Sequence, residues 1–353
     1  MNKKFVKNIK EFKLEKNHVF SGYYDINPLN NNKLLAHKKN KDEYTEIGYF
    51  DLDNKKFHKI DKTTLSSWQF GSRLQWLDNN NIIYNKKDKK SFCIIHNIET
   101  KKTKKISFPI FQIDKKSKNA TSLNFKHLYK FEKGYGYNNY KDGRDPNLYL
   151  INLKNDENKK ILDLNDLIVK INDKTLNKNN SYFILPFFNP DGNKIAFLFK
   201  WKTKNNTFAK LCVCNLKGSD LKIINEEGYV AHFNWVNDYE IIYVLKHKNK
   251  TNYFIFNTKD HEIKTLPLFN EDGHPSILKE YIVSDTYPSI FSRKQKLLFC
   301  DIKERNLSTL YFSIANYNHI NEKKCDFHPK ISSNKICIDD GSKFYRKIIL
   351  LEI

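Results

Sequence analysis

Residues 273–277 (Gly-His-Pro-Ser-Ile), followed by the apolar segment 281–283 and by Asp285, are the stretch around which the chain is organised. A close copy lies near the C-terminus, where residues 327–331 (Phe-His-Pro-Lys-Ile) precede another apolar segment and Asp339. In each copy an apolar residue stands three positions after the histidine, and an aspartate stands eleven positions after it. A histidine that recurs in register with a strand and a turn indicates a structural repeat.

The same phrase recurs along most of the chain: an apolar residue, a polar turn, and then two or three β-forming residues. A third and a fourth β-forming segment usually follow. We define the start of each unit as the residue three positions before the apolar residue. By this definition the units begin at Tyr23, Arg73, Leu185, His232, His274 and His328. The spacings between these starts are 50, 112, 47, 42 and 54 residues. The longest spacing holds a degenerate seventh unit around residues 123–153.

Seven units of about 40 to 55 residues with four strands each are typical of a β-propeller. We therefore predict an all-β fold, a seven-bladed β-propeller that forms a single domain over residues 1–353. Because the last unit supplies only three strands, we expect the N-terminal segment 5–14 to pair with the strand 347–353 and complete the last blade. The one short helix that the periodicity suggests lies at 161–171.

The chain carries a formal net charge of +22, from 62 Lys and Arg against 40 Asp and Glu. Solvated lysines on exposed turns account for such a charge, and so does a polyanionic partner. The lysines are spread along the whole chain, and no nucleic-acid-binding motif occurs. We therefore expect an acidic carbohydrate as the partner, and no nucleic acid.

No segment reaches the roughly 20 apolar residues of a membrane span, and the basic N-terminus lacks the apolar core of a signal peptide. The six cysteines show neither a disulfide-framework spacing nor a zinc-pair spacing, so we interpret them as reduced core thiols. The sequence therefore predicts a cytoplasmic protein and leaves its oligomeric state open.

In a propeller, the residues that open the innermost strands surround one mouth of the central channel. The repeat places five residues at that mouth: Tyr23, Arg73, His232, His274 and His328. The turns between second and third strands add a rim of His37, Lys38, Arg144, Lys200, His247, Asp285, Tyr287 and Asp339. Among the rim residues, we expect substrate contacts from His37, Arg144, Lys200 and Tyr287.

Three histidines at one mouth suit a divalent metal ion, because imidazole nitrogens bind zinc, manganese, iron or nickel. The three are His232, His274 and His328, and Asp326 is a candidate fourth ligand or an acceptor that orients a histidine. The alternative is structural, since a His-Pro pair at the start of a strand commonly forms a turn. Both interpretations stay open.

Four further residues are candidates for catalysis. Asp285 and Asp339 either cap turns or form a carboxylate pair for glycosyl transfer or hydrolysis. Arg73 in a channel requires an anion such as a ligand carboxylate. Tyr23 is a candidate base, or else a packing residue of the channel wall. The sequence contains no Gly-x-Ser-x-Gly, His-Glu-x-x-His or phosphate-binding glycine motif.

Six phrases spread over almost the whole chain carry a family resemblance. They are residues 20–25 (Phe-Ser-Gly-Tyr-Tyr-Asp), 74–77 (Leu-Gln-Trp-Leu), 189–192 (Asn-Pro-Asp-Gly), 273–276 (Gly-His-Pro-Ser), 285–288 (Asp-Thr-Tyr-Pro) and 325–329 (Cys-Asp-Phe-His-Pro). With them the chain resembles the TolB-type propellers, and particularly their oligogalacturonate-lyase-like branch. It also resembles propellers encoded in bacterial surface-polysaccharide clusters, which are often labelled glycosyltransferases.

The resemblance to the lyase branch implies a site. In that branch, histidines at the channel mouth hold a manganese-type ion against a uronate carboxylate, and an arginine takes the α-proton. His232, His274 and His328 stand where such ligands would stand, and Arg73 is the arginine at the mouth. The family has a glutamine and a further histidine close to its last ligand, whereas this chain has Cys-Asp-Phe at 325–327.

Taken together, these observations favour a carbohydrate-active protein that acts on an acidic bacterial polysaccharide or oligosaccharide. The first hypothesis is a metal-assisted, lyase-like enzyme with its site at the channel mouth. The alternatives are a glycosyltransferase and a non-catalytic propeller that binds glycans or acts as a scaffold in surface-polysaccharide biosynthesis. Fold by itself does not choose between these hypotheses.

Overall fold

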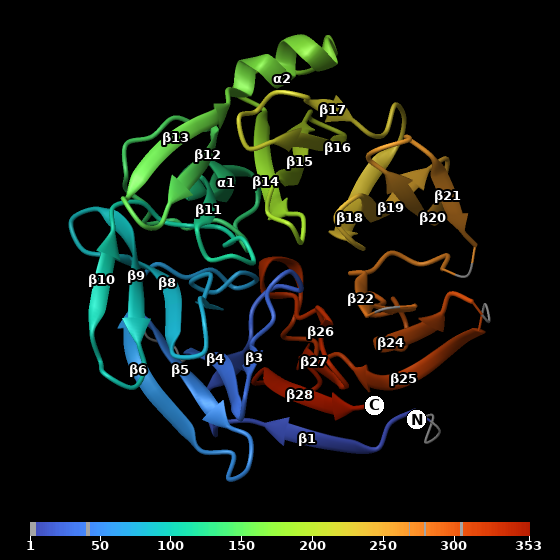
Figure 1. Ribbon diagram of the computed structural model, residues 1–353. Helices are drawn as coiled ribbons and strands as arrows, with labels where there is room; N and C mark the ends of the chain where they lie inside the picture. The colour runs from blue at the N-terminus through green and yellow to red at the C-terminus, as the bar shows by residue number, and fades with distance from the viewer. Residues whose placement is uncertain (1–4, 40–42, 268, 279, 304–305) are drawn as a thin grey trace. The chain divides into compact units, whose positions relative to one another are not determined.

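The computed structural model describes residues 5–39, 43–267, 269–278, 280–303 and 306–353. Within these residues the strands form seven sheets, which are labelled by strand in Figure 1. The predicted all-β, seven-bladed β-propeller fold is therefore confirmed. Close packing groups the chain into two compact units, and each is described by itself below. The prediction of a single domain stays a prediction.

The first unit holds residues 5–83, 96–102 and 269–353. One of its sheets consists of β2 (His18–Phe20), β3 (Leu29–Asn30), β4 (Lys33–Lys39), β5 (Thr45–Asp51) and β6 (Phe57–Thr63). A second consists of β22 (Ser276–Leu278), β23 (Tyr281–Asp285), β24 (Lys294–Asp301) and β25 (Asn306–Ile314). A third consists of β1 (Asn8–Phe12), β28 (Lys347–Glu352), β27 (Lys335–Asp340) and β26 (Lys330–Ser332).

The second unit holds residues 84–95 and 103–267. Its sheets are β11 (Asn119–Leu123), β12 (Leu148–Asn152) and β13 (Glu157–Leu162); β14 (Ser181–Phe188), β15 (Lys194–Lys202), β16 (Thr207–Asn215) and β17 (Lys222–Ile223); and β18 (Tyr229–Trp235), β19 (Glu240–His247), β20 (Lys250–Asn257) and β21 (Ile263–Leu266). The division between the units runs through the remaining sheet of β7 (Gln75–Trp76), β8 (Asn81–Lys87), β9 (Ser91–Asn97) and β10 (Thr103–Ile106).

The N-terminal strand completes the last sheet, as predicted. β1 runs antiparallel to β28, with Asn8 opposite Glu352 and Phe12 opposite Ile348, and the two strands lie side by side in Figure 1. Phe12 is fully buried in a cluster that includes Ile348 and Leu350. The two ends of the sequence therefore share one sheet, and β1 covers an edge of β28 that would otherwise be exposed.

The short apolar runs of the repeat become the second strand of each sheet. Leu34–Ala36 in β4, residues 82–84 in β8 and residues 195–197 in β15 are at most 1% exposed. A strand that is covered on both faces requires a continuous apolar run rather than alternation. This requirement explains why these runs were the strongest signal in the sequence.

Two short α-helices occur in the described chain. α2 (Leu164–Ile171) lies within the predicted helix 161–171 and begins late, because Asp163 forms a capping box with Asp166 and residues 161–162 belong to β13. α1 (Phe125–Phe131) was not predicted, and it lies between β11 and β12 in the degenerate unit. A 3-10 turn, η1, spans Asn321–Lys323. None of the described helices has the length and apolar character to span a membrane.

Three aligned positions of the repeat share a left-handed backbone. The φ angles are 57° at Arg73, 59° at Leu185 and 46° at His328. Such angles are uncommon for residues with bulky side chains and persist only where the surrounding structure holds them. Two of these residues, Arg73 and His328, belong to the group that the sequence singled out for chemistry.

Candidate metal centre

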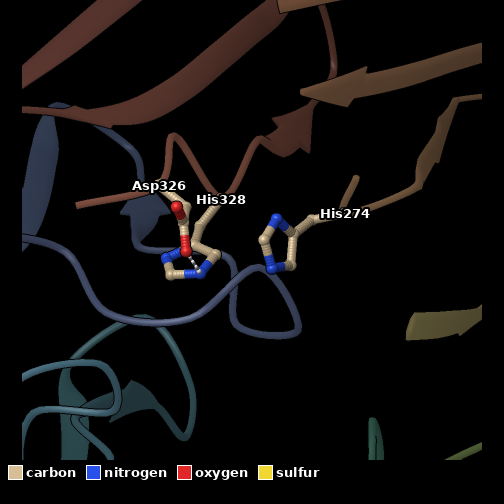
Figure 2. Close-up of side chains that lie close together, drawn as sticks. All are labelled: His274, Asp326 and His328. Carbon is tan, nitrogen blue, oxygen red and sulfur yellow. Dashed lines mark ion pairs between the residues drawn. The ribbon is translucent and has the colours of Figure 1, made fainter. Parts of the chain in front are cut away.

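Two of the predicted histidines and the predicted aspartate meet in the first unit. His274 lies two residues before β22, and His328 lies two residues before β26. One potential ligand atom from each of His274, Asp326 and His328 lies within 4.8 Å of the other two, and Figure 2 shows the three side chains together. All three residues are at most 1% exposed. We call these three residues the His-Asp-His cluster.

Asp285 fixes the orientation of His274. Its carboxylate accepts a hydrogen bond from Nδ1 of His274 (2.9 Å) and from the backbone N–H groups of His274 (2.8 Å) and His328 (3.0 Å). Burial raises the pKa of Asp285, but the electrostatic interaction with His274 and these hydrogen bonds outweigh burial and lower that pKa below its ordinary value. A carboxylate that binds Nδ1–H leaves Nε2 as the atom that can act as a ligand, which is the usual arrangement behind metal-binding histidines.

The other two members of the cluster are buried with open hydrogen-bonding capacity. Among the described residues, neither ring nitrogen of His328 and neither carboxylate oxygen of Asp326 has a hydrogen-bond partner, although Oδ2 of Asp326 forms an ion pair with Lys324 (3.2 Å). His328 Nε2 is 4.0 Å from Asp326 Oδ2, the pair joined by the dashed line in Figure 2. Burial, and next the electrostatic interaction with His274, hold the pKa of His328 well below its ordinary value, so its ring is neutral. Buried polar atoms without partners are costly, and a cation would satisfy them.

Tyrosine rings and one lysine surround the His-Asp-His cluster. The ring of Tyr23 lies 4.5 Å from that of His328 and 5.6 Å from that of His274, centroid to centroid. The rings of Tyr24 and Tyr287 lie 5.2 Å and 5.8 Å from that of His274. Lys324 Nζ is 3.2 Å from Asp326 Oδ2 and donates to the hydroxyl of Tyr287 (3.4 Å). The cluster therefore has aromatic walls and a neighbouring cation whose side chain is 31% exposed.

Arg73 belongs to the same unit, but its guanidinium binds Asp25. Nη1 and Nη2 of Arg73 lie 3.2 Å and 2.5 Å from the two carboxylate oxygens of Asp25, and both side chains are at most 1% exposed. The sequence analysis expected an anion beside Arg73 and looked for it in a ligand. The structure supplies that anion from within the chain, 48 residues away in the sequence.

The two in-register aspartates have different surroundings. Asp285 serves the histidines, whereas Asp339 accepts from the backbone N–H (2.8 Å) and the hydroxyl (3.0 Å) of Ser21. Asp339 also pairs with Lys330 (3.2 Å) and Arg346 (3.4 Å). Both carboxylates are at most 1% exposed. Each therefore holds neighbouring chain segments in place, which is the capping role that the sequence analysis left open beside the catalytic one.

His37, which was predicted to contact substrate, links β4 to the segment around Ser72 by a hydrogen bond. It is 1% exposed, and its Nε2 accepts from the backbone N–H of Ser72 (3.0 Å). Asn85 has the corresponding place at the end of β8, and its side-chain oxygen accepts from the backbone N–H of Ile110 (2.8 Å). In both cases a polar side chain of the second strand of a sheet accepts from a backbone N–H that follows the last strand of the same sheet. Asp339 does the same for Ser21.

The buried, hydrogen-bonded His37 predicts that the stability of the protein falls at acid pH. Burial lowers the pKa of His37 to about 3, whereas the unfolded chain protonates it near its ordinary value of 6.5. The folded state therefore resists protonation, and stability is lost as the pH falls from 6.5 towards 3, by up to about 5 kcal/mol for this one group. Urea unfolding of wild type and His37→Asn at pH 7, 5 and 4 measures this loss. Asparagine keeps an acceptor without a titrating group, so the difference between the two proteins should shrink towards acid pH.

Three predicted site residues lie in the second unit. His232 lies inside β18, at a register shift of that strand, and is 7% exposed. Arg144 donates to Asp142 (2.6 Å) and to the hydroxyl of Ser122 (2.9 Å), with its side chain 7% exposed. Lys200 donates to the hydroxyl of Tyr229 (3.0 Å). Their predicted roles, His232 as a ligand and the other two in substrate binding, stay predictions.

Sequence reasoning missed two residues beside the cluster, Tyr24 and Lys324, and it missed Asp25, the partner of Arg73. Lys324 carries a recognisable signal, because it stands two positions before Asp326 and four before His328. Asp25 enters the sequence analysis only within the phrase 20–25 that carries the family resemblance. Its pairing with Arg73 depends on contacts that neighbouring residues in the sequence do not specify.

No protein-family model matches the sequence, and no curated protein matches it. Among solved structures, the chain is similar to oligogalacturonate lyase from Vibrio parahaemolyticus, with a TM-score of 0.71 and 12% identity over 98% of this chain and 96% of that one. The tricorn protease matches with a TM-score of 0.58 and 11% identity, over 94% of this chain and 33% of that one. The β-propeller domain of the Trilobed protease from Pyrococcus furiosus matches with a TM-score of 0.53 and 10% identity, over 96% of this chain and 93% of that one. The predicted resemblance to oligogalacturonate lyase is thus confirmed as a shared seven-bladed fold.

Proposed function

We propose that this protein is a metal-dependent, lyase-like enzyme that cleaves acidic oligosaccharides or polysaccharides. The observation that carries the proposal is the His-Asp-His cluster, which is buried and contains nitrogen and oxygen atoms without hydrogen-bond partners among the described residues. The fold shared with oligogalacturonate lyase supports a uronate-containing substrate. The net charge of +22 supports a polyanion.

The cluster fits a divalent metal ion by its chemistry and size. Two imidazoles and a carboxylate form a donor set that zinc, manganese and iron accept. Donor atoms about 2 Å from one ion are at most about 4 Å apart, so the observed limit of 4.8 Å requires only a slight contraction. Asp285 supplies the outer carboxylate that such a histidine requires. His274, His328 and Asp326 would therefore hold the ion.

A metal ion held by these residues would supply a positive charge to neutralise the carboxylate of a uronate and to acidify the hydrogen on the neighbouring carbon. The chain then has three tasks. Asp285 keeps His274 in the tautomer that presents Nε2. Lys324, beside Asp326, offers a second positive charge to the substrate carboxylate. The rings of Tyr23, Tyr24 and Tyr287 limit the access of water to the cluster.

β-Elimination also requires a base that removes the acidified proton. Tyr23 is the favoured base, because its ring contacts both imidazoles and places it beside the reacting carbon. Arg73 is less suited to this role, since its guanidinium is held by both oxygens of Asp25. As the proton leaves, a carbon–carbon double bond forms, and the glycosidic oxygen departs with its electron pair. Asp285 and Asp339 are engaged with the chain, so no carboxylate-pair chemistry enters the proposal.

The test combines metal analysis with turnover. Purified protein should contain close to one divalent ion per chain by mass spectrometry, and oligogalacturonate should yield the ultraviolet absorbance of an unsaturated uronate. Chelation should lower the rate by about a hundredfold or more, and added manganese should restore it. Protein without bound metal and without product would refute the proposal. Metal-dependent binding of the oligosaccharide without product would instead identify a glycan-binding propeller.

A further inference from the structure

A row of exposed apolar side chains occupies one part of the first unit, on the sheet of β22–β25 and the loop after it. Ile290 and Phe291, in the turn between β23 and β24, are 88% and 95% exposed. We call the following set the exposed apolar row: Ile290, Phe291, Phe312, Ile314, Tyr317 and Ile320. The other large apolar residues that the described chain exposes are Val169, Tyr239, Ile263, Leu307 and Phe344. Single exposed apolar residues are ordinary, whereas a group of six requires an explanation.

The turn that carries Ile290 and Phe291 is well formed. Ser289 and Arg293 close it, with the backbone N–H of Arg293 donating to the carbonyl of Ser289 (3.0 Å). The backbone N–H of Ser289 donates to the carbonyl of Lys294 (3.0 Å), and Arg293 has a left-handed φ of 55°. The turn thus holds two consecutive apolar side chains at its tip, directed into solvent.

Hydrogen bonds join this turn to the rest of the exposed apolar row. In the pairing of β24 with β25, Lys294 lies opposite Ile314 and Lys296 lies opposite Phe312. The carbonyl of Arg293 accepts from the backbone N–H of Ala315 (2.9 Å), and its guanidinium donates to the carbonyl of Asn316 (3.1 Å). Tyr317 and Ile320 follow directly along the chain. The turn, the end of β25 and the loop after it are therefore neighbouring segments.

Cations lie between the apolar side chains. Lys294 Nζ is 4.3 Å from the ring centroid of Phe312, and Arg293 Cζ is 5.3 Å from that of Tyr317. Exposed lysines at 323 and 343 flank the loop, where the ring of His319 contacts the carbonyl of Lys343. Acidic residues also lie here: Glu322 is exposed in the loop, Glu271 pairs with Lys296 (3.6 Å), and the buried Asp340 accepts from the hydroxyls of Tyr311 and Ser313 in β25. The surroundings of the row are net positive.

We propose that the exposed apolar row docks on the anionic surface of a phospholipid bilayer. An apolar turn tip that enters the boundary between headgroups and acyl chains, with lysine and arginine left at the phosphate level, is the arrangement that interfacial binding requires. Tyrosine is also favoured at that depth. Protein interfaces, by contrast, are depleted of lysine. This inference does not depend on the His-Asp-His cluster.

The test uses vesicles of phosphatidylcholine with about 30% phosphatidylglycerol, compared with pure phosphatidylcholine. The wild type should sediment with the anionic vesicles. The affinity of the double variant Ile290→Ser/Phe291→Ser for these vesicles should be lower by about tenfold or more. The matched control is Val169→Ser/Ile263→Ser, which removes two exposed apolar residues from the second unit and should bind like the wild type. Because all four side chains are at least half exposed, melting temperatures should agree.

Insertion is measured separately from attraction. Phe291→Trp should show a blue-shifted emission on anionic vesicles and quenching by brominated lipid, whereas Val169→Trp should show neither. Equal binding by the wild type and the double variant would overturn the proposal, because attraction then follows from net charge alone. Absence of binding to anionic vesicles would also overturn it. So would a concentration-dependent dimer that the double variant abolishes, since the row would then be an interface between two copies of the chain.

Discussion

Replacing His328 by leucine should remove the bound metal and lower the elimination rate by about a thousandfold, with little change in the stability of the metal-free protein. The ring of His328 makes no hydrogen bond through either nitrogen within the described chain, so leucine removes a ligand without breaking a hydrogen bond. Loss of an outer partner of a metal ligand already costs about 10- to 100-fold, and loss of the ligand itself costs more.

The stability of this variant follows from what surrounds the ring. A buried polar atom without a partner opposes folding by about 1–3 kcal/mol, and leucine has none. Leucine at a φ of 46° is less favourable than histidine, which offsets part of that gain. We therefore expect the free energies of unfolding of the two metal-free proteins to agree within about 1 kcal/mol.

The matched control is His37→Leu, the same change at another buried histidine of the same unit. His37 accepts a hydrogen bond from the backbone of Ser72, so leucine leaves that N–H without an acceptor at a cost of about 1–3 kcal/mol. This variant should lose stability and keep its metal. Urea unfolding and metal analysis of both variants separate the two roles. Retained metal in His328→Leu, with a loss of stability like that of His37→Leu, would mean that His328 is structural.

Replacing Arg73 by alanine should lower the free energy of unfolding by about 3–5 kcal/mol. The change leaves the carboxylate of Asp25, which is 1% exposed, without the guanidinium that binds both of its oxygens. An uncompensated buried charge is among the few causes of so large an effect. Denaturant titration followed by circular dichroism measures it directly.

The double variant Arg73→Met/Asp25→Leu tests the cause. Removal of both charges leaves no buried ion without a partner, so it should recover stability to within about 1 kcal/mol of the wild type. Arg73→Gly should be slightly less harmful than Arg73→Ala, because the φ of 57° suits glycine. An Arg73→Ala protein of unchanged stability that turns over no substrate would contradict this account and would restore Arg73 as the base.

The sequence by itself determined the architecture. Seven units, the second strands at 34–36, 82–84 and 195–197, and the pairing of the N-terminal strand with β28 could all be predicted. Each depends on short-range information: an apolar run covered on both faces, a polar turn, and a count of strands. The helix α1 was not predictable in this way, because seven residues carry too little periodicity.

The candidate site could be predicted only in part. The recurrence of a histidine with an aspartate eleven residues later pointed to His274 and His328, and the structure brings these two side chains together with Asp326. The same spacing did not predict the partners of the aspartates. Asp285 binds His274, whereas Asp339 binds Ser21, 318 residues away in the sequence.

Tertiary structure decided which polar groups remain able to bind a metal ion and which already have hydrogen-bond or ion-pair partners within the chain. Arg73 is neutralised by Asp25, and His37 is bonded to Ser72, although both stood beside the metal ligands in the predicted mouth. Whether a segment forms a strand is determined by the pattern of apolar and polar residues over a few positions, so the sequence reveals it. The partner of a buried charge is set by segments that meet only after folding, because desolvation makes any nearby opposite charge or hydrogen-bond donor decisive.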